Sequence, residues 1–182
     1  SDQFQNVDSG VFRPQDGFSR NPTILFSLLE PIDGEGLIRL DGDYESSRQP
    51  QTSSTVLIEA KTGRRIAHFV DIDPIPEPGA ARGLMIRPLE ELLPKTRYIV
   101  GVHGLKGEQG VVAAPEGFRR LRDNQSSQDA QLDALQERFD AEVFSPLVAA
   151  GFERSNLQLA WDFTPASDES ITADMLRVRE LT

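Results

Sequence analysis

The sequence contains no cysteine, which excludes disulfide bonds, cysteine–metal sites and thiol catalysis. No run of about 18 or more apolar residues occurs, so we expect no segment that spans a membrane. The glycine spacing of phosphate-binding loops is missing. So is the Gly-x-Ser-x-Gly element on which α/β-type serine hydrolases carry their nucleophile. With only two histidines, His68 and His103, the chain has few groups for acid–base chemistry.

Positive charge is also scarce, with 19 Lys and Arg against 29 Asp and Glu and a net charge of −10. An acidic chain repels phosphate backbones, and no basic patch with interleaved aromatic residues compensates for this. The densest basic cluster, Arg119, Arg120 and Arg122, is interpreted as a solvated strand end. We therefore expect no nucleic-acid partner.

Short apolar or alternating segments separated by turn residues are present instead, and they predict β-strands. They follow an irregular lead-in over residues 1–22 and occupy residues 23–125. The expected strands are 23–29, 36–40, 54–60, 65–70, 82–88, 97–103, 111–113 and 118–121. Such spacing, with few helices, is typical of an antiparallel β-sandwich. The expected fold class is therefore mainly β.

Residues 126–153 change in character and predict a helical insertion. One apolar stripe recurs at steps of three and four residues, formed by Leu132, Leu135, Phe139, Val143 and Leu147. Ser126 with Asp129 resembles a capping box, Gly151 is a suitable C-terminal cap, and Pro146 is expected to kink the last turn.

Residues 154–166 predict the final strand and residues 167–182 a C-terminal helix. Leu157, Leu159, Trp161 and Phe163 alternate with Gln158, Ala160, Asp162 and Thr164, so we expect the two sets on opposite faces. The helix opens with acidic residues, as its dipole favours, and has Ile171, Met175 and Val178 on one face. We expect it to lead towards a further domain.

The stretch from Leu92 to Val102 reads L-x-P-x-T-x-Y-x-V-x-V. It resembles the corner before the F strand of fibronectin type III and other Ig-like domains, in which a tyrosine bonds backbone a few residues upstream. The resemblance covers about residues 20–122. It implies that Tyr98 is the corner tyrosine and that Leu92 and Pro94 shape the loop.

A second resemblance rests on short blocks in a fixed order: Asp16-Gly17-Phe18, Pro31-Ile32-Asp33, Thr96-Arg97-Tyr98 and the segment Leu157–Thr164. This order is similar to the N-terminal region of large exported bacterial lipase-like proteins, where a sandwich and helices precede an α/β-hydrolase-like domain. It implies a non-catalytic accessory module without a cofactor, in the periplasm, on the outer-membrane surface or outside the cell. The linked catalytic domain would be its partner.

Two other functions stay open. The first is a stand-alone hydrolase that uses His103 or His68 as a base, with a serine and a carboxylate brought together by the fold. The favoured interpretation is that each histidine is a structural residue within a strand or at the end of one. The second is an adhesion or carbohydrate-binding module in which Trp161, the only tryptophan, stacks on a sugar ring. Burial of Trp161 among its apolar neighbours is favoured.

Two groups of acidic residues are candidates for metal binding. Asp41, Asp43 and Glu45 alternate as the first ligands of a calcium loop do, but a glycine at the sixth position and a glutamate at the twelfth are missing. Asp71 and Asp73 are candidates for the same cation or for paired carboxylates. A solvated acidic loop is the favoured interpretation, with calcium as the alternative.

Overall fold

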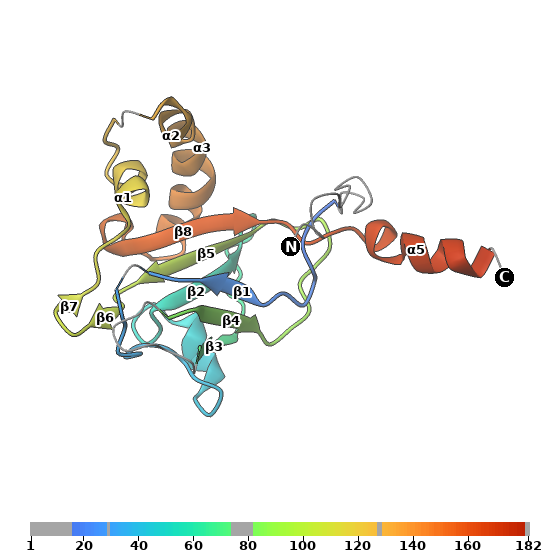
Figure 1. Cartoon of the computed structure of the whole chain (residues 1–182), viewed down its shortest axis with the longest axis horizontal. Coiled ribbons are helices and arrows are strands. Elements are labelled where there is room, and N and C mark those ends of the chain that lie inside the picture. The colour runs from blue at the N-terminus through green and yellow to red at the C-terminus, as the bar shows by residue number, and fades with distance from the viewer. Residues whose placement is uncertain (1–15, 29, 74–81, 127–128, 181–182) are drawn as a thin grey trace, which may run out of the picture.

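The computed structural model describes residues 16–28, 30–73, 82–126 and 129–180. It contains two three-stranded antiparallel sheets, a two-stranded hairpin and several helices (Figure 1). One sheet has the order β1-β4-β3 and the other the order β2-β5-β8. Their strands are β1 (Ile24–Phe26), β4 (Leu84–Pro88), β3 (His68–Ile72), β2 (Thr55–Glu59), β5 (Tyr98–His103) and β8 (Leu157–Phe163). Antiparallel sheets with added helices are thus confirmed, although the helices take a larger share of the chain than a mainly β fold class implies.

The two sheets face each other across one hydrophobic core. Ile86 and Val70 from the first sheet and Leu57 and Val100 from the second are fully buried members of it. The opposite face of β2 and β5 is covered by helices through a second core, to which Ile58 belongs. Because apolar residues cover both faces, these two strands show continuous apolar runs rather than alternation.

The chain changes sheets directly after β2. Gly63 turns with a φ of 70°, and Ile66 N donates to Leu57 O at 2.8 Å. The predicted strand 65–70 therefore begins beside β2 but becomes β3 of the other sheet from His68 onwards.

The predicted strand at 36–40 is wrong. Gly34 and Gly36 both have positive φ values, 84° and 79°, which an extended strand does not tolerate. Val70 N donates to Ile38 O at 2.7 Å, so the loop nonetheless lies along the edge of β3.

The predicted strand at 118–121 is also wrong, because this segment is helical. After the hairpin of β6 (Lys106–Gly107) and β7 (Gly110–Val111), α1 spans Glu116–Arg122. Phe118 and Leu121 lie three residues apart and are both buried in the second core. This spacing places both residues on one face of a helix. The sequence pattern of the segment fits a strand or a helix, and packing against the second core selects the helix.

The helical insertion is confirmed in place but not in detail. It consists of α2, α3, a π-helical turn η3 and α4, with bounds Ala130–Ala134, Gln136–Phe139, Asp140–Phe144 and Ser145–Ala149. Asp129, not Ser126, caps α2, by accepting from the backbone N–H of Gln131 at 2.8 Å. Leu135 is exposed and does not belong to the buried stripe. The π turn ends two residues before Pro146, which has no N–H to donate.

Strand β8 does not keep the strict alternation that its sequence predicts. A register irregularity falls opposite Val102 and His103. As a result Leu157 is in the second core, whereas Trp161 and Phe163 contact the core between the sheets. The strand is preceded by a 3₁₀ turn, η4 (Arg154–Asn156).

The C-terminal helix, α5 (Asp168–Glu180), extends away from the sheets (Figure 1). Ile171 and Met175 are 46% and 76% exposed. None of the helices formed by the described residues combines the length and the apolar composition that crossing a membrane requires.

Candidate functional site

Tyr98 begins strand β5 and is fully buried. Its hydroxyl oxygen accepts a hydrogen bond from Leu93 N at 3.0 Å, which is the upstream backbone contact that the corner resemblance implies. Its ring stacks on Phe163 with centroids 6.0 Å apart. Leu92 is buried beside it, and Pro94 O accepts from the Thr96 hydroxyl at 3.1 Å. The buried Tyr98 side chain thus anchors the loop before β5 to the core.

Replacing Tyr98 by phenylalanine is expected to destabilise the chain by about 1–2 kcal/mol, because Leu93 N loses its acceptor and the ring stays buried. Chemical denaturation measures this change. Tyr44→Phe is the matched control, because that hydroxyl donates to Leu40 O on the exposed surface and should contribute less. An equal loss in both variants would contradict a special role for the corner.

The N-terminal segment lies against the stretch that follows β8. Phe18 N donates to Thr164 O at 3.0 Å, and Ala166 N donates to Phe18 O at 2.8 Å, which forms a parallel bridge. A Cβ atom on Gly17 would lie 2.6–2.7 Å from backbone atoms of residues 164–166. Only glycine permits this approach of two backbones.

Asp16 joins this segment to the start of α5. Its carboxylate accepts from Ser167 N at 2.9 Å and from the Ser167 hydroxyl at 2.7 Å, and it pairs with Lys95. The hydrogen bond from Lys95 and those from Ser167 hold the pKa of Asp16 well below its usual range. Asp16 is therefore negatively charged close to the N-terminus of a helix, where the helix dipole favours an anion.

Arg20 adds a second connection. Its guanidinium pairs with Asp168 at 2.7 Å and with Glu91 at 3.2 Å, while its backbone oxygen accepts from Leu92 N. We call the meeting of residues 16–20, 91–95 and 164–170 the α5 junction. The block Asp16-Gly17-Phe18, the loop that begins near Leu92 and the end of the segment Leu157–Thr164 thus meet where α5 leaves the sheets.

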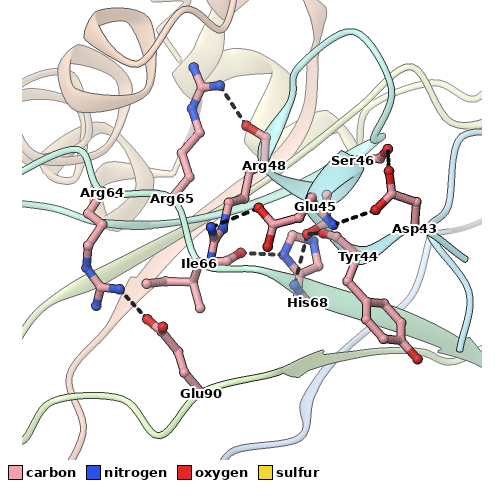
Figure 2. A network of polar contacts seen from close by, with 11 residues as sticks. Asp43, Tyr44, Glu45, Ser46, Arg48, Arg64, Arg65, Ile66, His68 and Glu90 are labelled. Carbon is pink, nitrogen blue, oxygen red and sulfur yellow. Dashed lines mark hydrogen bonds and ion pairs between the residues drawn. The ribbon is translucent and has the colours of Figure 1, made fainter.

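His68 is fully buried, and both ring nitrogens have hydrogen-bond partners. Figure 2 shows the ring beside Ile66. Nδ1 lies 2.9 Å from Ile66 O and must donate to it, because a carbonyl oxygen only accepts. Nε2 then accepts from the Thr55 hydroxyl at 2.9 Å. Burial lowers the pKa of His68. This arrangement stabilises a neutral ring inside the core.

His103 lies at the end of β5 and lines a small cleft of about 250 Å³ with Ser54, Glu35 and Lys106. Burial lowers its pKa, and its ring packs edge-on against Phe152. His103 N donates to Ser54 O at 2.9 Å, so the two residues are cross-strand neighbours. Within the described part of the chain, however, no hydrogen bond joins the Ser54 hydroxyl to the imidazole. The contact that would activate a serine nucleophile is not formed.

The three acidic calcium candidates lie on the surface but serve local contacts. Asp43 caps the 3₁₀ turn η2 (Tyr44–Arg48) by accepting from Glu45 N at 3.1 Å, and Glu45 pairs with Arg48 at 2.9 Å (Figure 2). Asp41 is exposed. Among the residues that the structure describes, no three Asp, Glu or His side chains gather as a metal site would require.

Asp71 lies on β3, and Asp73 follows directly after that strand. The Asp71 carboxylate accepts from Arg87 Nε at 2.5 Å on the outer face of the sheet. Asp73 N donates to Gly83 O at 2.9 Å, which closes the end of the β3–β4 pair. Asp162, on β8, accepts two hydrogen bonds from Arg138 at 2.6 and 2.7 Å and so ties the helical layer to the sheet.

Trp161 is partly buried against the core between the sheets, with its ring centroid 5.8 Å from that of Phe26. The side chain therefore contributes to the packing between the sheets.

Sequence patterns missed two structural roles. Lys95 belongs to no recognisable motif. Ser167 followed by two acidic residues is typical of a helix start, and Ser170 N donates to the Ser167 hydroxyl at 3.0 Å. Neither residue is linked to Asp16 by the sequence pattern. Gln158 was placed on a polar face but is fully buried. Only contacts across more than 50 residues reveal these roles.

No protein-family model matches this chain, and no curated protein is significantly similar to it.

Proposed function

We propose that this chain is a non-catalytic accessory module of an exported bacterial lipase- or esterase-like protein, and that it supports or presents a linked catalytic domain. The observation that carries the proposal is α5, which extends from the body with Ile171, Met175 and Leu176 each more than 40% exposed. Large apolar side chains on one projecting helix favour a partner surface that covers them.

The proposed fold family is that of the Ig-like and fibronectin type III-like sandwiches. In Ig constant-type domains, one sheet contains strands A, B, E and D and the other strands C, F and G. With β1 as strand B, the orders β1-β4-β3 and β2-β5-β8 correspond to B-E-D and C-F-G. Tyr98 then stands at the start of strand F, where such domains carry their corner tyrosine. Domains of this shape mostly carry or bind other groups.

The two histidines of the chain also favour a non-catalytic role. The buried ring of His68 is bonded at both nitrogens, and His103 has no hydrogen bond to the serine beside it. Neither histidine is therefore arranged as the base of a Ser–His pair.

The coding DNA beyond the codon for Thr182 tests the proposal directly. An open frame that contains a Gly-x-Ser-x-Gly element followed by an aspartate and a histidine would support an accessory module of a hydrolase. A stop codon immediately after Thr182 would overturn it.

The chain by itself is expected to hydrolyse no p-nitrophenyl ester above the rate of buffer containing denatured chain. The physical reason is the missing nucleophile–base contact. Steady-state release of p-nitrophenol over a range of acyl lengths measures this. Turnover that disappears in His103→Ala or His68→Ala would establish the alternative, a stand-alone hydrolase.

A further inference from the structure

Residues 16–20 lie across the start of α5, although about 150 positions separate the two in sequence. We propose that this segment, the strap, sets the direction in which α5 leaves the body, so that α5 is a rigid arm and not a free linker. The proposal concerns the arm itself. Only the use of the arm in presenting a linked domain rests on the proposed function.

The first support is the number of contacts that converge on one carboxylate. Asp16 accepts from the backbone and the hydroxyl of Ser167 and pairs with Lys95. Ser167 in turn accepts from Ser170 N at 3.0 Å, inside the first turn of the helix. Asp16 therefore holds the residue that caps α5, and a shift of Asp16 would leave the first turn without its anchor.

The second support is that the strap and the segment before α5 join by backbone, not by side chains alone. The parallel bridge between Phe18 and Pro165 has two hydrogen bonds, at 3.0 and 2.8 Å. The absence of a side chain on Gly17 lets the two backbones approach this closely. Backbone pairing restricts the rotation of α5 about its own connection more strongly than a flexible ion pair does.

The third support comes from the loop before β5, which contacts the same point from the other side. Lys95 N donates to Pro165 O at 3.0 Å, and this lysine has a φ of 53°, an unfavourable conformation for a residue with a side chain. The surrounding contacts hold Lys95 in this conformation. Because Tyr98 anchors that loop to the core, α5 is connected through it to the buried centre of the protein.

The first turn of α5 also contacts the strap through side chains. Asp168 pairs with Arg20, and the Ser170 hydroxyl accepts from Asp16 N at 3.4 Å. Beyond that turn, Figure 1 shows the helix running away from both sheets. A small change at the junction therefore moves the far end of α5 by a large distance.

The absence of cysteine allows a direct test, because two introduced cysteines are the only sites that a spin label can modify. Lys61→Cys labels the exposed turn after β2, and Arg177→Cys labels an exposed position on α5. Pulsed electron paramagnetic resonance then measures the distribution of distances between the two labels. We expect one narrow distribution for the otherwise unchanged chain and a distribution at least about twofold wider for Asp16→Ala.

Two further variants sharpen the test. Lys95→Ala removes one contact of the Asp16 carboxylate and should widen the distribution less than Asp16→Ala. Glu35→Gln removes an exposed ion pair with Lys106 elsewhere on the body and should leave the width unchanged. Circular dichroism at the same temperature confirms that each variant is folded, and if Asp16→Ala does not fold, Lys95→Ala carries the comparison with Glu35→Gln.

Equal widths of the distance distributions in the parent, the junction variants and the control would overturn the proposal that the strap sets the direction of α5. So would a broad distribution in the parent chain. Neither result bears on the function proposed above, because the coding frame beyond Thr182 decides that separately.

Discussion

Replacing Gln158 by leucine is expected to lower the free energy of unfolding by about 3 kcal/mol or more. The Gln158 side chain is buried within β8, and its amide makes three hydrogen bonds to the backbone beside the β6–β7 hairpin. Its Oε1 accepts from Leu105 N at 2.8 Å, and its Nε2 donates to Leu105 O at 2.9 Å and to Val112 O at 2.6 Å. Leucine keeps most of the volume but leaves Leu105 N and Val112 O unpaired, and each such buried group costs about 1–3 kcal/mol. Leu105 O keeps its hydrogen bond from Val112 N at 3.0 Å.

Chemical denaturation followed by far-ultraviolet circular dichroism measures this loss. Gln109→Leu is the matched control, because Gln109 is exposed on the same hairpin. The control is expected to change stability by no more than about 0.5 kcal/mol. A loss below about 1 kcal/mol for Gln158→Leu would show that water or a rearranged hairpin satisfies Leu105 N and Val112 O.

Acidification is expected to destabilise the chain from about pH 6.5 downwards through His68. Burial lowers the pKa of His68 in the folded chain below the value of the free side chain. Between these two pKa values the unfolded chain binds a proton that the folded chain does not, so stability falls as the pH falls. One histidine contributes a slope of at most about 1.4 kcal/mol per pH unit, and the slope ends once the folded form is also protonated.

The free energy of unfolding measured at half-unit steps from pH 7.5 to pH 5 tests this. His68→Gln is expected to be less stable at every pH but to lose most of the slope, because glutamine does not titrate. His103 is partly exposed, and its lowered pKa adds a smaller slope of the same sign. A parallel pH dependence in the parent and in His68→Gln would assign the acid sensitivity to other groups.

Local pattern predicted well where one physical requirement dominates. Strands β2, β4 and β5 are found where runs such as Tyr98–His103 predict them. The β-branched residues in such runs favour a buried strand over other conformations. The helix over Asp168–Glu180 was predicted for a similar reason, since its acids and apolar face agree on one conformation.

Prediction failed where two conformations satisfy the same short pattern. Phe118 and Leu121 suit a short strand or one face of a helix, and only the second core selects the helix. Leu157 was assigned to the face of Trp161, but the irregularity opposite His103 moves it to the other core. Such a shift depends on a neighbouring strand that lies more than 50 residues away in sequence.

The sequence by itself determined that the chain forms antiparallel strands with added helices, and where strands β2, β4 and β5 and helix α5 lie. These follow from periodicity, turn residues and caps, which act over a few positions. Only the tertiary structure decided that His68 is bonded on both sides in the core, that Gln158 supports a hairpin and that Asp16 holds the start of α5. These roles arise from contacts between distant segments, and local residue order contains no information on which distant donor will meet which acceptor.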